Sequence, residues 1–265
     1  MKIALLSDIH EDIVSLKKAM KMIEIEKCDH IICLGDILGY PYRRAKYENT
    51  KNADECINII KSNCSIVLLG NHDLFHLKKF PEYQSGFNLP ENWYQLSAEE
   101  KRHFAGDHVW NYSDDYSVEI QPRNKEYMMS LSEHAIKSFG SQSVLFSHFV
   151  YPNFTGYIAS YSGDGKKIKK HFDFMKKANC ELSICGHLHM EGLGICYGPG
   201  ESLLTHIFKG FIYFSYGEKK IKGKSSCVSI PALADNGQVN GIAVLDMNNA
   251  IVKSISLNTN RRFIL

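Results

Sequence analysis

Five short apolar stretches of this chain each end in residues of the kinds that bind metal ions. The stretches occupy residues 5–10, 31–36, 66–72, 144–148 and 182–189. Because each apolar run is short, it predicts a buried β-strand, and helical patterns between the first three runs predict a sheet with parallel strands. Ligands gather outside the carboxyl ends of such strands. The five endings are therefore expected to form one site.

In the first ending, an aspartate and a histidine are separated by one residue. Asp8 and His10 follow an apolar strand that is predicted at residues 2–7. Residues i and i+2 at the end of a strand point to the same side of the sheet. We therefore expect these two side chains to bind one cation from a single rim.

Length and composition predict one large α/β domain over residues 1–265. Hydrophobic residues make up 44% of the chain, and the formal net charge of +2 is too small to indicate bulk binding of nucleic acid or of a membrane surface. No apolar run approaches the ~20 residues of a membrane helix. The first predicted strand begins at Lys2, which leaves no room for a signal peptide, so a cytoplasmic location is expected. Neither the length nor the composition of the chain indicates its oligomeric state.

The eight cysteines include no C-x-x-C pair, which is the spacing that zinc knuckles and redox pairs need. Several lie within apolar runs, as Cys33 and Cys185 do. We therefore expect reduced, buried thiols that belong to the core.

Helical and β-rich patterns surround the five endings. The helices, predicted from apolar spacing, span residues 12–27, 53–61 and 167–178, and Asp12 is placed to cap the first. Four β-rich runs follow in the C-terminal part, at residues 207–216, 227–230, 241–246 and 250–256. We expect these runs to form the antiparallel strands of a second sheet that packs on the first.

Residues 74–142 are rich in Tyr, Phe and Trp and are interpreted as a helical excursion within the domain. Residues 97–100 read Ser-Ala-Glu-Glu and fit a helix capping box, while residues 117–120 predict a short return strand. A long excursion between site motifs is often a lid or a binding surface. Packing on the sheet is nevertheless the more frequent role of any single aromatic residue.

The side chains at the five endings suit a centre of two metal ions. The candidate ligands are Asp8, His10, Asp36, Asn71, His148, His187 and His189. Seven ligands exceed the three or four of a single catalytic zinc ion, but they suit two divalent cations that share one carboxylate. Imidazole among oxygen ligands favours Mn, Fe, Zn, Co or Ni over Ca or Mg. The sequence does not distinguish among these transition metals.

The charge of such a centre favours an anionic substrate. Two divalent cations bring four positive charges, and two carboxylates with a bridging hydroxide remove three, which leaves a surplus of about +1. Phosphate esters fit this surplus, because two metals roughly 3.5 to 4 Å apart generate hydroxide and hold the oxygens of an in-line displacement at phosphorus. His72 is left over as the expected general acid for the departing alkoxide. A small phosphate ester or nucleotide is the expected substrate.

Taken together, the five endings resemble the ordered motifs of the calcineurin-like metallophosphoesterases. These are D-x-H at Asp8 and His10, G-D-x-x-G at residues 35–39, G-N-H-D at residues 70–73, a strand-end histidine at His148, and G-H-x-H at residues 186–189. The resemblance spans residues 8–189. It implies a four-layer α/β/β/α sandwich with two mixed sheets.

The same resemblance implies a role for each motif residue. It places Asp8, His10, Asp36 and His189 on a first metal, and Asp36, Asn71, His148 and His187 on a second. Asp36 then bridges the metals, and His72 lies at the leaving group. The short loops resemble the compact bacterial and archaeal phosphodiesterase branch, which implies hydrolysis of phosphodiesters.

Three features depart from the pattern of that branch. Glu11 and Asp12 follow the first motif and are expected to add negative charge near the mouth of the site. Phe149 stands where the branch often has glycine, and residues 230–233 replace a glycine-serine turn.

The second motif also differs from that of the protein phosphatases. Gly39 and Tyr40 occupy the places of an acid and an arginine in those enzymes, which disfavours protein-phosphatase activity. Arg43 follows closely and is a candidate to bind a substrate phosphate.

Alternatives to a phosphodiesterase remain open. A phosphomonoesterase or a dinucleoside-polyphosphate hydrolase would share the same motifs, because substrate choice resides in loops such as residues 74–142. A scaffold protein is the alternative outside the enzymes, since the retromer scaffold subunit resembles this fold without metal-dependent catalysis. Metal content distinguishes the scaffold from the enzymes.

Overall fold

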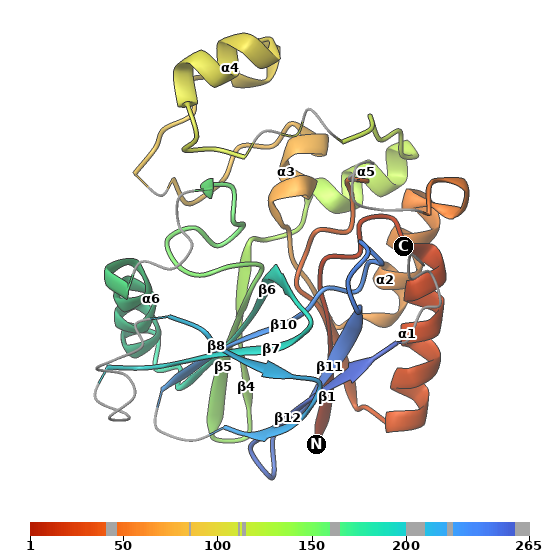
Figure 1. Ribbon diagram of the computed structural model, residues 1–265, viewed down its shortest axis with the longest axis vertical. Coiled ribbons are helices and arrows are strands. Elements are labelled where there is room, and N and C mark those ends of the chain that lie inside the picture. Colours follow the sequence, from red (N-terminus) through yellow and green to blue (C-terminus); the bar gives the residue numbers. More distant parts are fainter. Residues whose placement is uncertain are drawn as a thin grey trace.

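The computed structural model describes residues 1–40, 47–84, 86–110, 112, 115–159, 165–199, 210–221 and 225–257. Two sheets, each of six strands in these ranges, pack face to face. Helices α1 (Ile13–Glu26) and α2 (Ala53–Asn63) lie on one side of the sheets and α6 (Gly165–Lys177) on the other (Figure 1). The predicted α/β/β/α sandwich with two mixed sheets is confirmed.

The first sheet joins parallel N-terminal strands to antiparallel C-terminal strands. β1 (Lys2–Leu6) pairs parallel with β2 (His30–Cys33), and β2 pairs parallel with β3 (Ile66–Val67). The other edge of β1 continues, with antiparallel pairing throughout, into β11 (Gly241–Asp246), β12 (Ile251–Ser256) and β9 (Gly217–Lys220).

The second sheet is built around three parallel strands, which are β5 (Gln142–Ser147), β6 (Leu182–Met190) and β10 (Ser226–Pro231). β4 (His134–Phe139) flanks β5 in antiparallel orientation. On the far side, β7 (Gly192–Tyr197) pairs antiparallel with β10, and β8 (Ile212–Ser215) pairs antiparallel with β7.

The prediction that the C-terminal runs form a second sheet of their own is wrong. β11 and β12 extend the first sheet, whereas β8 and β10 lie in the second, and β10 runs parallel to β6. The physical reason is that buried backbone N–H and C=O groups must be paired on both edges of a central strand. β2 pairs with only one edge of β1, and β11 pairs with the other. Residues 207–209 lie outside the described residues.

Three apolar layers lie between the four layers of helices and sheets. Successive side chains of a strand point into different apolar layers. In β1, Ala4 and Leu6 pack in the cluster that contains α1 and α2, while Ile3 and Leu5 pack in the cluster between the sheets. In the second sheet, strand residues such as Leu145 pack with Phe172 and Met175 of α6. This period of two is the ordinary pleat of a strand, and burial of both sheet faces explains why the strands read as continuous apolar runs.

The predicted helices form with the predicted caps. The Asp12 carboxylate accepts a hydrogen bond from the Ser15 N–H at 3.0 Å at the start of α1. At α4 (Ala98–Ala105), Ser97 and Glu100 form the reciprocal bonds of a capping box. No helix in the described ranges is both long and apolar enough to cross a membrane.

The excursion contains more regular structure than the sequence indicates. Its elements are α3 (Asn71–Leu77), η2 (Trp93–Gln95), α4, α5 (Pro122–Met129) and β4, and a separate 3-10 turn η1 (Glu48–Thr50) precedes it. The predicted return strand at residues 117–120 is wrong, because these described residues form no strand. Val118 and Ile120 instead pack against the α1–α2 cluster.

Candidate metal centre

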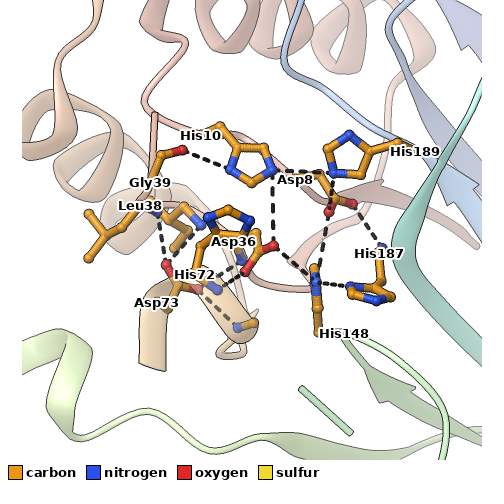
Figure 2. Close-up of polar contacts among 12 residues, drawn as sticks. Asp8, His10, Asp36, Leu38, Gly39, His72, Asp73, His148, His187 and His189 are labelled. Carbon is orange, nitrogen blue, oxygen red and sulfur yellow. Dashed lines mark hydrogen bonds and ion pairs between the residues drawn. The ribbon is translucent and has the colours of Figure 1, made fainter. Parts of the chain in front are cut away.

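The ends of strands from both sheets meet at one edge of the sandwich. Loops after β1 and β2 supply Asp8, His10 and Asp36 from the first sheet, and the start of α3 supplies Asn71 and His72. The second sheet supplies His148 after β5 and the histidine pair His187 and His189 within β6. In Figure 2, the carboxylates of Asp8 and Asp36 lie among the imidazoles of these residues.

One group of candidate ligands consists of Asp8, His10 and His189, whose ligand atoms lie within 4.8 Å of one another. His189 Nε2 is 3.1 Å from Asp8 Oδ1, and His10 Nε2 faces His189 Nε2 at 3.3 Å. Three of the four ligands that the resemblance implies for the first metal are therefore together.

A second group consists of Asp8, Asp36 and His148. His148 Nε2 lies 3.2 Å from Asp36 Oδ2 and 3.8 Å from Asp8 Oδ1, and His187 Nδ1 lies 3.3 Å from His148 Nε2. Asp36 Oδ2 also lies 4.0 Å from His10 Nε2. Asp8 belongs to both groups, and the Asp36 carboxylate faces His10 of the first group as well as His148 of the second.

The side chains of Asp8 and His10 converge for a different reason from the one predicted. β1 ends at Leu6, and both residues have left-handed backbone, with φ of 56° at Asp8 and 45° at His10. Asp36, His187 and His189 also have positive φ. Non-glycine residues in this region cost about 1 to 3 kcal/mol each and cluster at functional sites. A turn, rather than the pleat of a strand, therefore aims Asp8 and His10.

Backbone bonds from distant segments hold that turn. The N–H of Asp8 donates to the Gly35 carbonyl at 3.0 Å, and the N–H of His10 donates to the Asp36 carbonyl at 2.9 Å. From the loop after β10, the N–H of Ala234 donates to the Asp8 carbonyl at 2.9 Å. Within residues 230–233, the N–H of Leu233 donates to the Ser7 carbonyl at 2.9 Å, so this segment and Ala234 together hold the backbone that leads into the first motif.

Two histidines are oriented by backbone carbonyls. His10 Nδ1 lies 2.9 Å from the Gly39 oxygen, and His148 Nδ1 lies 3.1 Å from the Leu34 oxygen. A carbonyl only accepts, so Nδ1 carries the proton in each ring and, in the neutral tautomer, Nε2 keeps the lone pair that a metal ion would bind. Metal-binding histidines are held in this way.

The chemistry of these groups fits divalent cations. Burial, with the charge of His72, lowers the pKa of His10 to about 4, and burial with the charge of His148 lowers the pKa of His187 to about 3. Both rings are therefore neutral, as ligands must be. Among the described residues, Asp8 Oδ1 and Asn71 Oδ1 are buried without a partner in hydrogen-bonding geometry. Cations would satisfy both oxygens.

The pKa shifts of Asp8 and His148 also fit a site for divalent cations. Burial raises the pKa of Asp8, but His189 and His148 outweigh burial and hold that pKa well below its usual range. Burial lowers the pKa of His148, but Asp36 and Asp8 outweigh it and raise this pKa to about 9. The two buried carboxylates thus remain ionised with His148 as a positive partner, and a divalent ion would supply that charge in place of the His148 proton when it binds.

His72 lies beside these groups and is held by a carboxylate that the sequence analysis missed. His72 Nδ1 is 2.6 Å from Asp115 Oδ2, and His76 Nε2 is 3.2 Å from the same oxygen. The four-residue spacing of the two histidines on one helix was a usable signal for a shared partner. Nothing in the sequence pointed to Asp115, which lies in the excursion.

The same contact explains why residue 39 is glycine. A Cβ at Gly39 would lie 2.6 Å from His72 Nδ1 and 2.9 Å from Asp115 Oδ2, and its φ is +89°. Asp115 thus occupies the space beside His72 that a side chain at residue 39 would need.

Asp73, to which the sequence assigned no firm role, ties two motifs together. Its carboxylate accepts hydrogen bonds from the backbone N–H groups of Asp36, Ile37, Leu38 and Gly70, at 2.8 to 3.0 Å. These bonds hold the backbone around Asp36 against the start of α3.

The acids after the first motif do not add charge to the mouth. Glu11 is buried, and its carboxylate accepts from the Gly39 N–H at 3.1 Å and from Lys51 Nζ at 3.3 Å. Asp12 is also buried and caps α1. That prediction is wrong, because both carboxylates turn inward to backbone and lysine donors. Arg43 lies outside the described residues.

The chain is similar in sequence to known proteins. A family profile described as calcineurin-like phosphoesterase matches residues 1–191. A stretch of 71 residues is 34% identical to an uncharacterized protein of Methanocaldococcus jannaschii, covering 27% of this chain and 26% of that protein. The chain thus matches about a quarter of the length of that relative.

Solved structures show the same fold. A metallophosphoesterase from Sphaerobacter thermophilus is similar with a TM-score of 0.64 and 17% identity, over 97% of this chain and 87% of that one. A hypothetical protein from Pyrococcus horikoshii is similar with a TM-score of 0.55 and 14% identity, over 96% and 87%. The profile covers most of the chain and all five motifs, and the family implies divalent metal ions and action on phosphate esters. The chain belongs to the calcineurin-like phosphoesterase family.

Proposed function

We propose that the chain hydrolyses phosphodiesters at a centre of two divalent transition metals. The observation that supports this proposal best is that the Asp36 carboxylate faces candidate ligands of both metals, His10 at 4.0 Å and His148 at 3.2 Å. Asp8, His10 and His189 form one group, and Asp36 contacts His148 of the other at 3.2 Å.

In this proposal, the residues of each group hold one cation. Asp8, His10, Asp36 and His189 hold the first, and Asp36, Asn71, His148 and His187 hold the second. Two such cations supply a hydroxide nucleophile near neutral pH and offset negative charge at the phosphoryl oxygens. The surplus of positive charge at such a centre suits an anionic phosphate ester, and the resemblance to the compact phosphodiesterase branch favours a diester.

His72 is proposed to give the proton to the leaving oxygen. Asp115 engages Nδ1, which leaves Nε2 as the nitrogen that transfers the proton. Burial lowers the pKa of His72, but Asp36 and Asp115 outweigh burial and raise it to about 9. The imidazole is thus protonated at neutral pH, as a general acid must be.

Metal removal is the first test. Incubation with a chelator should abolish hydrolysis, and Mn or another imidazole-favouring cation should restore it far better than Ca. The measurement is the rate on a phosphodiester before chelation, after it, and after each metal is added back. Full activity in chelator would refute the proposal, and a chain that binds no divalent metal would instead support the scaffold alternative.

A panel of esters tests the preference for diesters. Diesters should be hydrolysed with a higher kcat/KM than monoesters of the same alcohol. A higher kcat/KM on monoesters, or on dinucleoside polyphosphates, would replace the diesterase with one of those activities while leaving the metal centre in place.

The Asp115→Asn variant tests the support of His72. Loss of a partner that orients a functional histidine costs about 10- to 100-fold in activity, and a similar loss of kcat is expected here on esters with poor leaving groups. Because Asp115 helps to raise the pKa of His72, its loss should also move the alkaline limb of the pH profile to lower pH. Asp173→Asn, on the exposed surface of α6, is the control and should change neither. An unshifted pH profile would leave Asp115 a purely structural role.

A further inference from the structure

A cavity of about 400 Å³ lies within the excursion, beside the proposed metal centre. It is lined by residues of α3, η2 and α4 and by the segment that follows α4. Sites for small ligands are clefts of roughly 300 to 1,000 Å³, so the cavity is large enough to hold one organic group.

Two residues belong both to the wall of this cavity and to the surroundings of the centre. The Trp110 ring contacts His187 with ring centroids 6.2 Å apart, and the Tyr112 ring contacts His72 at 4.9 Å. Trp110 and Tyr112 therefore connect the wall of the cavity to the histidines of the proposed centre. Trp110 is 44% exposed, which is unusual for an indole that only fills a core.

The walls are suited to a flat aromatic group. Phe75 stacks on Tyr112 with ring centroids 4.5 Å apart, and Trp93 also lines the cavity. Lys101 Nζ lies 5.7 Å from the ring centroids of both Phe75 and Trp93. Stacking on such rings favours any base with a π-face, while a nearby ammonium group can donate to ring nitrogens or carbonyl oxygens.

The charges on the cavity wall also indicate which kind of ligand the cavity would bind. Lys101 and Arg102 line the cavity with Asp107 as the acidic member of the wall, which gives it a positive balance. A heteroaromatic base attached to phosphate offers both a flat face for the rings and acceptors for these cations, and a purely apolar chain offers no acceptor.

We propose that this cavity receives the base of a nucleotide-type phosphate ester while the phosphate lies at the metal centre. The inference rests on the proposed function and narrows its substrate class. The excursion is then the part of the chain that selects the organic group, and the five motifs handle the phosphate.

The chain offers a specific reporter for this cavity. It contains two tryptophans, Trp93 and Trp110, and both line the cavity. Quenching of tryptophan emission therefore reports on its occupancy. Adenosine 5′-monophosphate and ribose 5-phosphate form the probe pair, because they share the sugar and the phosphate and differ by the base. Stopped-flow mixing with the metal-loaded protein records binding before any hydrolysis.

The monophosphate with the base should bind about 10- to 100-fold more tightly than the sugar phosphate, and it should quench the tryptophan emission. Lys101→Met should weaken binding of adenosine 5′-monophosphate about 3- to 10-fold and leave ribose 5-phosphate within twofold. Lys125→Met, which makes the same charge change on exposed α5, is the matched control and should bind both probes as the parent does.

A second variant tests the cavity without changing the charge of Lys101. Ala98 is exposed at the first position of α4 and lines the cavity, so Ala98→Phe adds a ring to the wall without disturbing the core. It should reduce the affinity for adenosine 5′-monophosphate about 10-fold or more and leave ribose 5-phosphate within twofold.

The outcomes separate the two proposals. Equal affinity for the two probes, or tight binding of the base with unchanged tryptophan emission, would overturn the cavity assignment even if phosphodiesters are hydrolysed. Absence of hydrolysis on every ester, with base-dependent quenching that Lys101→Met weakens, would overturn the proposed function and support the cavity assignment.

Discussion

Replacement of Asp36 by asparagine should abolish turnover, by at least about 10³-fold in kcat, and should lower the metal content from two ions per chain to one or none. Asp36 Oδ2 lies 3.2 Å from His148 Nε2 and 4.0 Å from His10 Nε2, between the two ligand groups. A factor of 10³ corresponds to about 4 kcal/mol of transition-state free energy, a plausible share for a ligand to both metals.

The fold should survive this substitution, because it removes a charge without changing the volume. Elemental analysis gives the metal content, and circular dichroism with a thermal melt checks the fold, with Asp173→Asn as the surface control. Retention of two metals per chain would contradict the bridging role. A variant that is unfolded would be replaced by Asp36→Glu, which keeps the charge and should retain part of the metal content.

His72→Ala should retain both metals and lose about 10² to 10⁴ in rate on esters with poor alkoxide leaving groups. Esters with an activated aryl leaving group should lose less, because that oxygen is already stable as an anion. The measurement is the dependence of the rate on the pKa of the leaving group, for the parent and for the variant. A steeper dependence in the variant is the signature of a lost general acid.

His76→Ala is the matched control for this experiment. His76 shares Asp115 Oδ2 with His72 and lies four residues along the same helix, so its removal reproduces the loss of a buried imidazole beside Asp115. It should change the rate less than tenfold and leave the leaving-group dependence as it is in the parent. Equal losses across all esters in His72→Ala would make His72 a phosphate contact, and lost metal would make it a ligand or a structural support.

Local patterns in the sequence determined the elements and the composition of the site. Asp12 and Ser97 cap their helices with bonds to residues only three positions away, so the caps could be predicted from adjacent residues. The order of the five motifs, each after an apolar run, indicated that Asp8, Asp36 and His148 would meet, and the structure places them in one group.

Tertiary structure alone decided which strands share a sheet and how the ligands are aimed. β11 pairs with β1 across more than 200 residues of sequence, and an apolar pattern does not specify which edge a strand will choose. The left-handed backbone at Asp8 depends on bonds to Gly35 and Ala234. Asp115 beside His72 and the aromatic cavity likewise arise from contacts between distant segments, whose energies no local sequence pattern contains.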